Sequence, residues 1–124
     1  MDDELRRRSF AGADPTNAAA PVQRQLDAYN AHDLERFVAE YAVDVEVFRP
    51  PAGNPVLSGL RSLAAHYASN RFTRPDLHAE VTNRIVAGDI VVDHERITGL
   101  QADVVEAVAV YKVVDGKIRT VWFF

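Results

Sequence analysis

The sequence changes its hydrophobic period near residue 76, and this change limits the folds that it can adopt. Before that point apolar residues recur every three or four positions, as on one face of a helix. After it, Val, Ile, Thr and aromatic residues dominate, which is typical of strands. Helices followed by an antiparallel sheet, without a βαβ repeat, predict an α+β fold. The length of 124 residues fits one domain.

The first of three predicted helices spans about 18–31. Val22, Leu26 and Tyr29 share one face of it at helical spacing. Pro21 lacks a backbone N–H and therefore fits the first turn of this helix, where that group needs no partner.

Two shorter helices are predicted to follow. Asp33 is a good N-cap for the second, because its carboxylate accepts hydrogen bonds from free N–H groups, and Tyr41 lies at its end. Ser58 is a possible cap for the third, which has Tyr67 on its apolar face and ends near Asn70.

Five strands are predicted. A short one, "VDVEVF" at 43–48, precedes the third helix and ends where Pro50 and Pro51 interrupt any ladder of hydrogen bonds. The other four form the second part of the chain, and they cover residues 76–86, 89–98, 104–114 and 117–124. We expect them to pair through turns at "AGD", "GLQAD" and "DG".

The dipeptide Asp115-Gly116 is the strongest hairpin signal, because both residues tolerate the positive φ angles of a type I′ turn. A two-residue turn there pairs Val113 with Ile118, Tyr111 with Thr120 and Ala109 with Trp122. It leaves Val108, Val110, Val121 and Phe123 on the opposite face. Both faces of this hairpin are then apolar away from the turn.

An apolar second face predicts a partner for the sheet, since helices can cover only one side. We predict a homodimer that packs through the uncovered face. The alternative is that the N-terminal segment folds over this face. Residues 1–17 are charged, then small and polar, and we expect them to form a flexible arm ahead of a domain at 18–124.

Composition excludes several kinds of function. A net charge of -4 and a pI near 5.5 argue against nucleic-acid binding, which needs clustered Lys and Arg. The absence of cysteine excludes disulfides and thiolate chemistry, and it suits a cytoplasmic protein. No apolar run is long enough to span a membrane, and no phosphate loop or metal-ligand spacing predicts a cofactor or a metal.

Three segments carry a resemblance to a known superfamily. They are "LDAYNAHDLERFVAEYAVDVEVFRP", "LSGLRSLAAHY" and the closing "AVAVYKVVDGKIRTVWFF". Over residues 20–124 the chain resembles nuclear transport factor 2-like (NTF2-like) domains, which include ketosteroid isomerases and SnoaL-like polyketide cyclases. The resemblance implies a cystatin-like, cone-shaped fold with about three helices on a curved, mostly antiparallel sheet, and a small apolar or aromatic molecule bound inside the cone.

The same resemblance indicates that the isomerase machinery is missing. The position of the isomerase base, a carboxylate before the strand-ending proline, is occupied by Arg49, which cannot lose its proton near neutral pH. The oxyanion-binding tyrosine falls at Gln25, with Tyr29 one turn later, and its acidic partner falls near Ala109. Tyr41 and Tyr67 match two tyrosines that support the isomerase pocket, and we expect both to shape a pocket here.

Four ionisable residues in "VVDHERITG" are candidates for chemistry. Strand alternation places His94 and Arg96 on one face and Asp93 and Glu95 on the other. We predict that His94 and Arg96 face the pocket, where His94 would transfer a proton. If "AGD" is a three-residue loop, Glu80 lies opposite Arg96.

Arg49 would orient or stabilise an anionic oxygen of the ligand at the pocket mouth. Two alternatives stay open: Arg49 in a structural ion pair with Asp44, Glu46 or a sheet carboxylate, and His94 as a hydrogen-bonded strand residue. The predicted function is an isomerase or cyclase that acts by proton transfer. Its alternative is a non-catalytic ligand-binding or dimerisation module, and a hydrolase or dehydratase is a third, weaker hypothesis.

Overall fold

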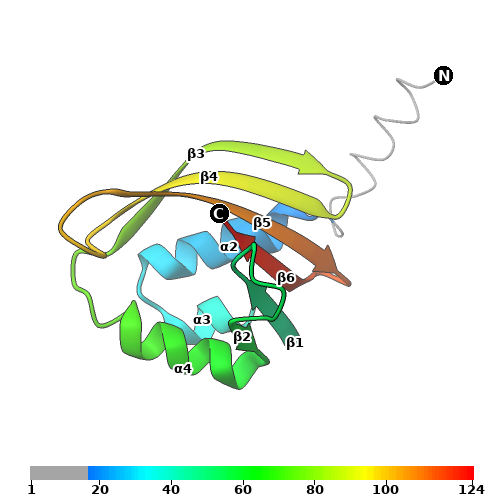
Figure 1. Ribbon diagram of the computed structural model, residues 1–124, viewed down its shortest axis with the longest axis horizontal. Helices are drawn as coiled ribbons and strands as arrows, with labels where there is room; N and C mark the ends of the chain where they lie inside the picture. Colours follow the sequence, from blue (N-terminus) through cyan, green and yellow to red (C-terminus); the bar gives the residue numbers. More distant parts are fainter. Residues whose placement is uncertain (1–16) are drawn as a thin grey trace.

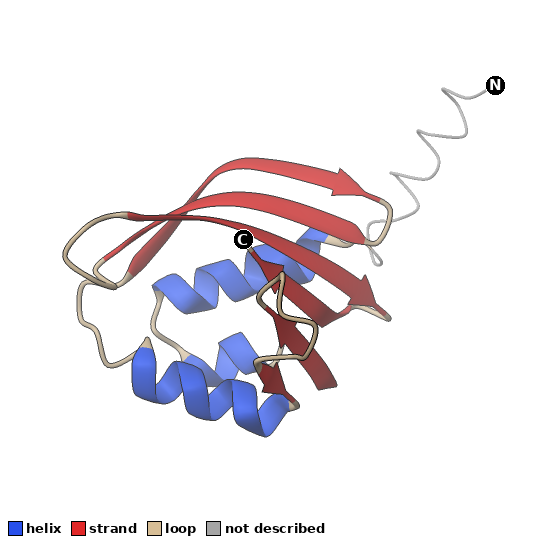
Figure 2. Ribbon diagram, viewed as in Figure 1, coloured by secondary structure: helices blue, strands red, loops and turns tan. Residues whose placement is uncertain are grey.

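The computed structural model describes residues 17–124, so nearly all of the predicted arm at 1–17 lies outside the described residues. Its helices are α2 (Ala19–Asn30), α3 (Leu34–Val38) and α4 (Leu60–Asn70). All three lie on the same side of one sheet (Figure 2). Their bounds lie close to those predicted from the sequence.

The sheet has six strands in the order β2-β1-β6-β5-β4-β3 and is curved around the helices (Figure 1). Its strands are β1 (Tyr41–Phe48), β2 (Leu57–Ser58), β3 (His78–Ala87), β4 (Ile90–Thr98), β5 (Val105–Val114) and β6 (Lys117–Phe123). Only β1 and β6 pair in parallel. This mostly antiparallel, helix-covered sheet confirms the predicted α+β class.

Local signals place the two short helices. The carboxylate of Asp33 accepts a hydrogen bond from the backbone N–H of Arg36 at 3.1 Å, as predicted for an N-cap. Ser58 is not the cap of α4, because it pairs with Glu46 in β2. Gly59 takes that place, with a φ of 88° that disfavours any side chain. Tyr41 opens β1 instead of ending a helix.

A bulge changes the predicted register of the last hairpin. Asp115 and Gly116 have φ angles of 52° and 77°, as a type I′ turn requires, and Val113 pairs with Ile118 as predicted. The register then slips by one residue, so the predicted pairs of Tyr111 with Thr120 and of Ala109 with Trp122 are wrong. The observed partners are Val121 and Phe123 respectively.

This slip exchanges the faces of β6. Val121 and Phe123 now join Tyr111 on the helix-covered inner face, while Trp122 lies beside Val110 on the outer face. Both faces keep apolar residues, so the basis for the predicted partner of the sheet is unchanged.

A second bulge preserves one predicted pair. β3 and β4 are joined by Gly88 and Asp89 alone, which is shorter than the three-residue loop considered above. An extra residue near Thr82 compensates, so Glu80 still lies opposite Arg96.

Phe37 of α3 is the centre of an aromatic cluster between the helices and the sheet. Its side chain is 1% exposed, and its ring lies 4.6 Å from that of Tyr67 and 5.0 Å from that of Tyr41, between centroids. The rings of Tyr29 and Phe72 complete the cluster. A five-residue helix is too short to be stable alone, so this packing holds α3 in place.

Phe37→Ala should therefore lower the free energy of unfolding by about 3–5 kcal/mol, because it removes a fully buried ring and leaves a cavity. Urea denaturation followed by circular dichroism measures the change. Val43→Ala is the control: Val43 is 78% exposed, and its replacement should change stability by less than about 0.5 kcal/mol. Equal losses in the two variants would contradict a central role for Phe37.

Candidate functional site

A small cavity lies inside the cone, between the helices and the inner face of the sheet. Its volume is about 30 Å³, enough for ordered water. Half of the residues in its wall are aromatic, and the wall consists of Gln25, Leu26, Tyr29, Phe37, Tyr41, Tyr67, Arg71, Ala79, Glu95, Ile97, Tyr111 and Phe123. Among the described residues, the wall thus places one carboxylate and one guanidinium beside aromatic rings and their hydroxyls, an arrangement typical of a ligand site.

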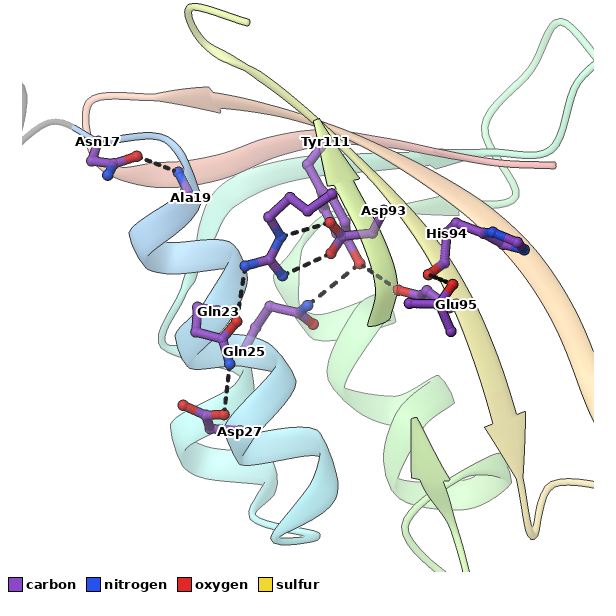
Figure 3. A network of polar contacts seen from close by, with 11 residues as sticks. Asn17, Ala19, Gln23, Gln25, Asp27, Asp93, His94, Glu95 and Tyr111 are labelled. Atoms are coloured by element: carbon purple, nitrogen blue, oxygen red, sulfur yellow. Dashed lines mark hydrogen bonds and ion pairs between the residues drawn. The ribbon is translucent and has the colours of Figure 1, made fainter. Parts of the chain in front are cut away.

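Glu95 of β4 provides that carboxylate, and its side chain is buried at 5% exposure. The hydroxyl of Tyr111 on β5 donates a hydrogen bond to Oε2 of Glu95 at 3.3 Å (Figure 3). No hydrogen bond from the described residues reaches the other oxygen, Oε1. Because Glu95 lines the cavity, Oε1 is the oxygen best placed to exchange a proton with a bound molecule.

A chain of hydrogen bonds leads to Glu95 from the far wall. The hydroxyl of Tyr41 donates to Oε1 of Gln25 at 3.0 Å, and Nε2 of Gln25 donates to the hydroxyl of Tyr111 at 3.4 Å. Every donor in this chain points toward the carboxylate. The chain thus stabilises Glu95 as an acceptor and fixes the position of its side chain.

The pKa of Glu95 is raised to about 7. Burial is the largest cause, because it disfavours the charged carboxylate, and the like charge of Asp93 adds to it. The hydrogen bond from Tyr111 and the charges of Arg71 and Arg84 act in the opposite direction. A carboxyl group with a pKa near neutrality can serve as either a base or an acid.

Asp93 lies on the same face of β4 and is completely buried. Its carboxylate forms a bidentate pair with Arg84 of β3, at 2.7 Å from Nε to Oδ1 and 2.9 Å from Nη2 to Oδ2. Gln23 of α2 accepts a third hydrogen bond from Arg84 at 2.8 Å. Such a fork is the geometry in which a buried carboxylate keeps its charge.

Arg71, which follows α4, provides the cation in the cavity wall. Its Nη1 donates to the hydroxyl of Tyr29 at 2.9 Å, and its guanidinium carbon lies 5.4 Å from the centre of the Tyr67 ring. These contacts hold the side chain against the wall by a hydrogen bond and a cation–π interaction. A positive group so placed can stabilise negative charge that develops on a ligand.

A second, larger cavity of about 130 Å³ adjoins the first at Tyr67 and Phe123, which line both. Arg49 and His66 lie in its wall, and the Arg49 guanidinium is 5.2 Å from the centre of the Phe123 ring. Burial lowers the pKa of His66, and the charges of Arg71 and Arg49 lower it further. Arg49 thus provides the fixed positive charge in the wall of this second cavity, which we call the mouth cavity.

The structure brings most of the predicted site residues together. Gln25, Tyr29, Tyr41 and Tyr67 line the inner cavity, and Arg49 lines the mouth. Asp44, one partner considered for Arg49, pairs instead with Arg119 at 3.1 Å. Ala109 is buried on the inner face of the sheet without reaching the cavity wall.

His94 and Arg96 do not face the cavity, so the predicted assignment of faces was wrong. The predicted alternation is correct, but His94 is 46% exposed on the outer face, 3.5 Å from Glu106, and Arg96 is exposed beside it. In Figure 3 the His94 ring lies on the opposite side of the sheet from Asp93 and Gln25. His94 thus has no geometry for proton transfer in the cone.

Sequence reasoning missed Glu95, and a signal for it existed. Ala109 was expected on the pocket face, and in the observed β4–β5 hairpin Ala109 lies opposite Asp93. If β4 and β5 are aligned in this register, Asp93 and Glu95 share the face of Ala109, so this pairing would have assigned both acids to the inner face. Arg71 and Tyr111 were missed for lack of such a signal, since neither belongs to a motif.

Two further findings concern residues 17–124. This part of the chain contains no group of three or more His, Cys, Asp or Glu side chains that could hold a metal ion. None of its helices is long and apolar enough to cross a membrane.

Comparisons with known proteins agree with this architecture. The model of the SnoaL-like domain family matches residues 22–121. No curated protein matches the sequence significantly. An uncharacterized cystatin fold protein from Novosphingobium aromaticivorans is 24% identical, with a TM-score of 0.79 over 87% of this chain and 97% of that one.

Two other solved structures are similar. A provisionally named ketosteroid isomerase from Kribbella flavida is 23% identical, with a TM-score of 0.75 over 90% of this chain and 78% of that one. A provisionally named SnoaL-like polyketide cyclase from Jannaschia is 21% identical, with a TM-score of 0.74 over 89% and 85% of the two chains. At these identities the likeness establishes the fold alone.

The raised pKa of Glu95 predicts an unusual dependence of stability on pH. The folded state binds the proton of Glu95 more tightly than the unfolded state, whose pKa is near 4.5. The contribution of Glu95 to stability is therefore greatest below pH 4.5 and is lost as the pH rises to about 7, by roughly 3 kcal/mol.

Glu95→Gln should remove this loss, so the variant should be more stable than the wild type at pH 8 by up to about 3 kcal/mol. A weaker hydrogen bond from Tyr111 to the amide should reduce this gain. Chemical denaturation between pH 5 and pH 8 measures the difference. Glu106→Gln, which changes an exposed carboxylate, should follow the wild type at each pH. A Glu95→Gln variant that loses stability equally at all pH values would contradict the raised pKa.

Proposed function

The chain belongs to the SnoaL-like family, and on that premise we propose that it binds a small apolar or aromatic molecule in the cone and transfers a proton on it with Glu95. The observation that carries the proposal is the carboxyl group of Glu95 in the cavity wall, which is buried and has a pKa of about 7. The resemblance assigns the role of the isomerase base to the position of Arg49, which cannot act as a base, and Glu95 would take over this role from β4.

Glu95 has the properties that a proton carrier requires. Near neutral pH both its charged and its neutral forms are well populated, so it can remove a proton from one ligand atom and return it to another. Tyr111 holds one carboxyl oxygen, which leaves the other for the ligand. An isomerisation needs such a shuttle, because the proton is removed and returned within one turnover.

Removal of a proton from carbon places negative charge on an adjacent oxygen of the ligand. Arg71 lies in the same cavity as Glu95, and we assign to it the stabilisation of this enolate oxygen. Arg49 would orient the polar end of the ligand from the mouth cavity. Tyr41 and Tyr67 contribute shape, since burial raises the pKa of both hydroxyls and keeps them neutral.

The alternative is a non-catalytic ligand-binding module. The small volume of the inner cavity, about 30 Å³, supports it, because a bound molecule must occupy mainly the mouth or displace the wall. The two functions differ in one observable: both predict binding, but only the first predicts exchange of a ligand proton.

Binding can be tested with ligand-induced thermal shifts on a panel of steroids, terpenoids and aromatic polyketides. A ligand that stabilises the wild type should stabilise Arg49→Ala less, because the variant loses the positive charge at the mouth. Arg61→Ala is the control, since Arg61 is an exposed residue of α4. Equal shifts in wild type and Arg49→Ala would contradict the orienting role of Arg49.

Proton transfer can be tested with 1-indanone, a small enolisable aromatic ketone, in deuterated water. The wild type should accelerate exchange at C2, followed by proton NMR, with a rate that rises with pH through a midpoint near 7. Glu95→Gln should lower the rate on the order of 10²-fold or more, whereas Glu106→Gln should not. Binding of the ketone without accelerated exchange would favour the non-catalytic module.

We also propose that the outer face of the sheet packs against a second copy of the chain. Half-buried Phe48, Val92, Val108, Val110 and Trp122 lie together on this face, and Ile85 beside them is 59% exposed. None of the described helices covers it (Figure 2). A contiguous apolar face of this kind is typical of a subunit interface.

A cytoplasmic location also stays a prediction.

Val110→Glu should break this homodimer, because it places a charge at the centre of the face. Sedimentation velocity of the full chain should show a dimer for the wild type and a monomer for the variant. Val43→Glu, on an exposed part of β1, should remain dimeric. A monomeric wild type would overturn the proposal and favour cover by the N-terminal segment.

A further inference from the structure

The cone contains a second carboxylate that the proposed reaction does not use. Asp93 lies two residues before Glu95 on the inner face of β4, and it is the most deeply buried charged residue among those described, at 0% exposure. Asp93 does not line the cavity, so it does not reach a ligand. A buried charge without contact to the ligand requires another explanation.

Arg84 accounts for the charge of Asp93. Its fork closes on both carboxylate oxygens, and Gln23 accepts from the third nitrogen, so the side chain is fixed at three points. The carboxylate side of the pair is dry, but the Arg84 side chain is 20% exposed. Asp93 therefore stays negative beside Glu95 while its partner keeps contact with solvent.

We propose that Asp93, held by Arg84, is a positioning group that sets how readily Glu95 takes up a proton. The proposal rests on the proposed function of Glu95 as the proton carrier. Two carboxylates on one face of a strand repel each other in a dry interior, so the charge of Asp93 favours the neutral form of Glu95. Arg84 limits this effect, because its positive charge offsets part of the field of Asp93.

Other groups also face Glu95 and act with different signs. Tyr111 of β5 donates a hydrogen bond to it and favours its charged form, as do the positive charges of Arg71 and Arg84. The neutral hydroxyls of Tyr29, Tyr41 and Tyr67 come from α2, β1 and α4. Among residues 17–124, Asp93 is the negative charge that opposes them, and after burial it is the largest cause that raises the pKa of Glu95.

The test is the titration of Glu95 in the ligand-free full chain by carbon-13 NMR of its side-chain carboxyl. Loss of the signal in Glu95→Gln assigns it. Asp93→Asn keeps the shape of the side chain but removes its charge, so the midpoint for Glu95 should move to lower pH by roughly one pH unit.

Arg84→Gln should have the opposite effect. This variant removes the positive charge beside Asp93 and Glu95, so their negative charges repel each other more strongly. The first proton that either carboxylate takes up should therefore bind at higher pH than in the wild type. Arg84→Lys, which keeps the charge, should titrate closer to the wild type than Arg84→Gln does. Asp44→Asn, the same change in the exposed ion pair with Arg119, should leave the midpoint of Glu95 unchanged.

Opposite shifts distinguish the proposal from simple damage to the fold. Water that entered a loosened cone would lower the midpoint in both variants, and such a result would overturn the proposal, as would an unchanged midpoint in Asp93→Asn. If Asp93→Asn does not fold, Arg84→Gln still tests the proposal, because an unchanged or lower midpoint in that variant would overturn it. Because no ligand is present, the outcome is independent of proton transfer on 1-indanone, so each proposal can fail separately.

Discussion

The site depends on the burial of two carboxylates inside an apolar cone. An isolated charge in such a place is strongly destabilised, and the two acids meet this constraint differently. Asp93 keeps its charge because the fork of Arg84 compensates it, whereas Glu95 has one hydroxyl donor and gains from a proton. The same strand thus holds one ion-paired carboxylate and one carboxyl group whose pKa lies near neutrality. The two carboxyl groups differ in how readily they bind a proton because Asp93 pairs with a guanidinium, whereas Glu95 accepts a hydrogen bond from a hydroxyl.

Sequence periodicity predicted the fold well, because helices and strands of this chain follow simple patterns of burial. The three helices, the strands β3 to β6 and the turn at Asp115-Gly116 were all evident from spacing and turn chemistry. The faces of β6 were not, because the bulge after Ile118 leaves no mark in a segment that is apolar on both sides. Single-residue slips of this kind depend on tertiary packing.

The cavity wall was predicted in part, because strand alternation alone does not identify the inner face of a strand. Period two divides "VVDHERITG" into two faces but cannot say which is the inner one, since Val91 and Ile97 on one side resemble Ile90 and Val92 on the other. The neutral lining residues Gln25, Tyr29, Tyr41 and Tyr67 were placed correctly because helix and family patterns located them. Arg71 and Arg84 lie near Glu95 and Asp93 because of the tertiary fold, and no local sequence pattern predicts these contacts.

The burial of Glu95 has a consequence for how this chain can change. A group that favours unfolding at neutral pH opposes selection for stability, so a population of variants chosen only for heat resistance should tend to replace it by neutral residues. The exposed acids of the outer face carry no such penalty. If selection for stability alone removes Glu95, the sequence must meet two different requirements. One is a stable cone, and the other is a buried carboxyl group that can bind and release a proton.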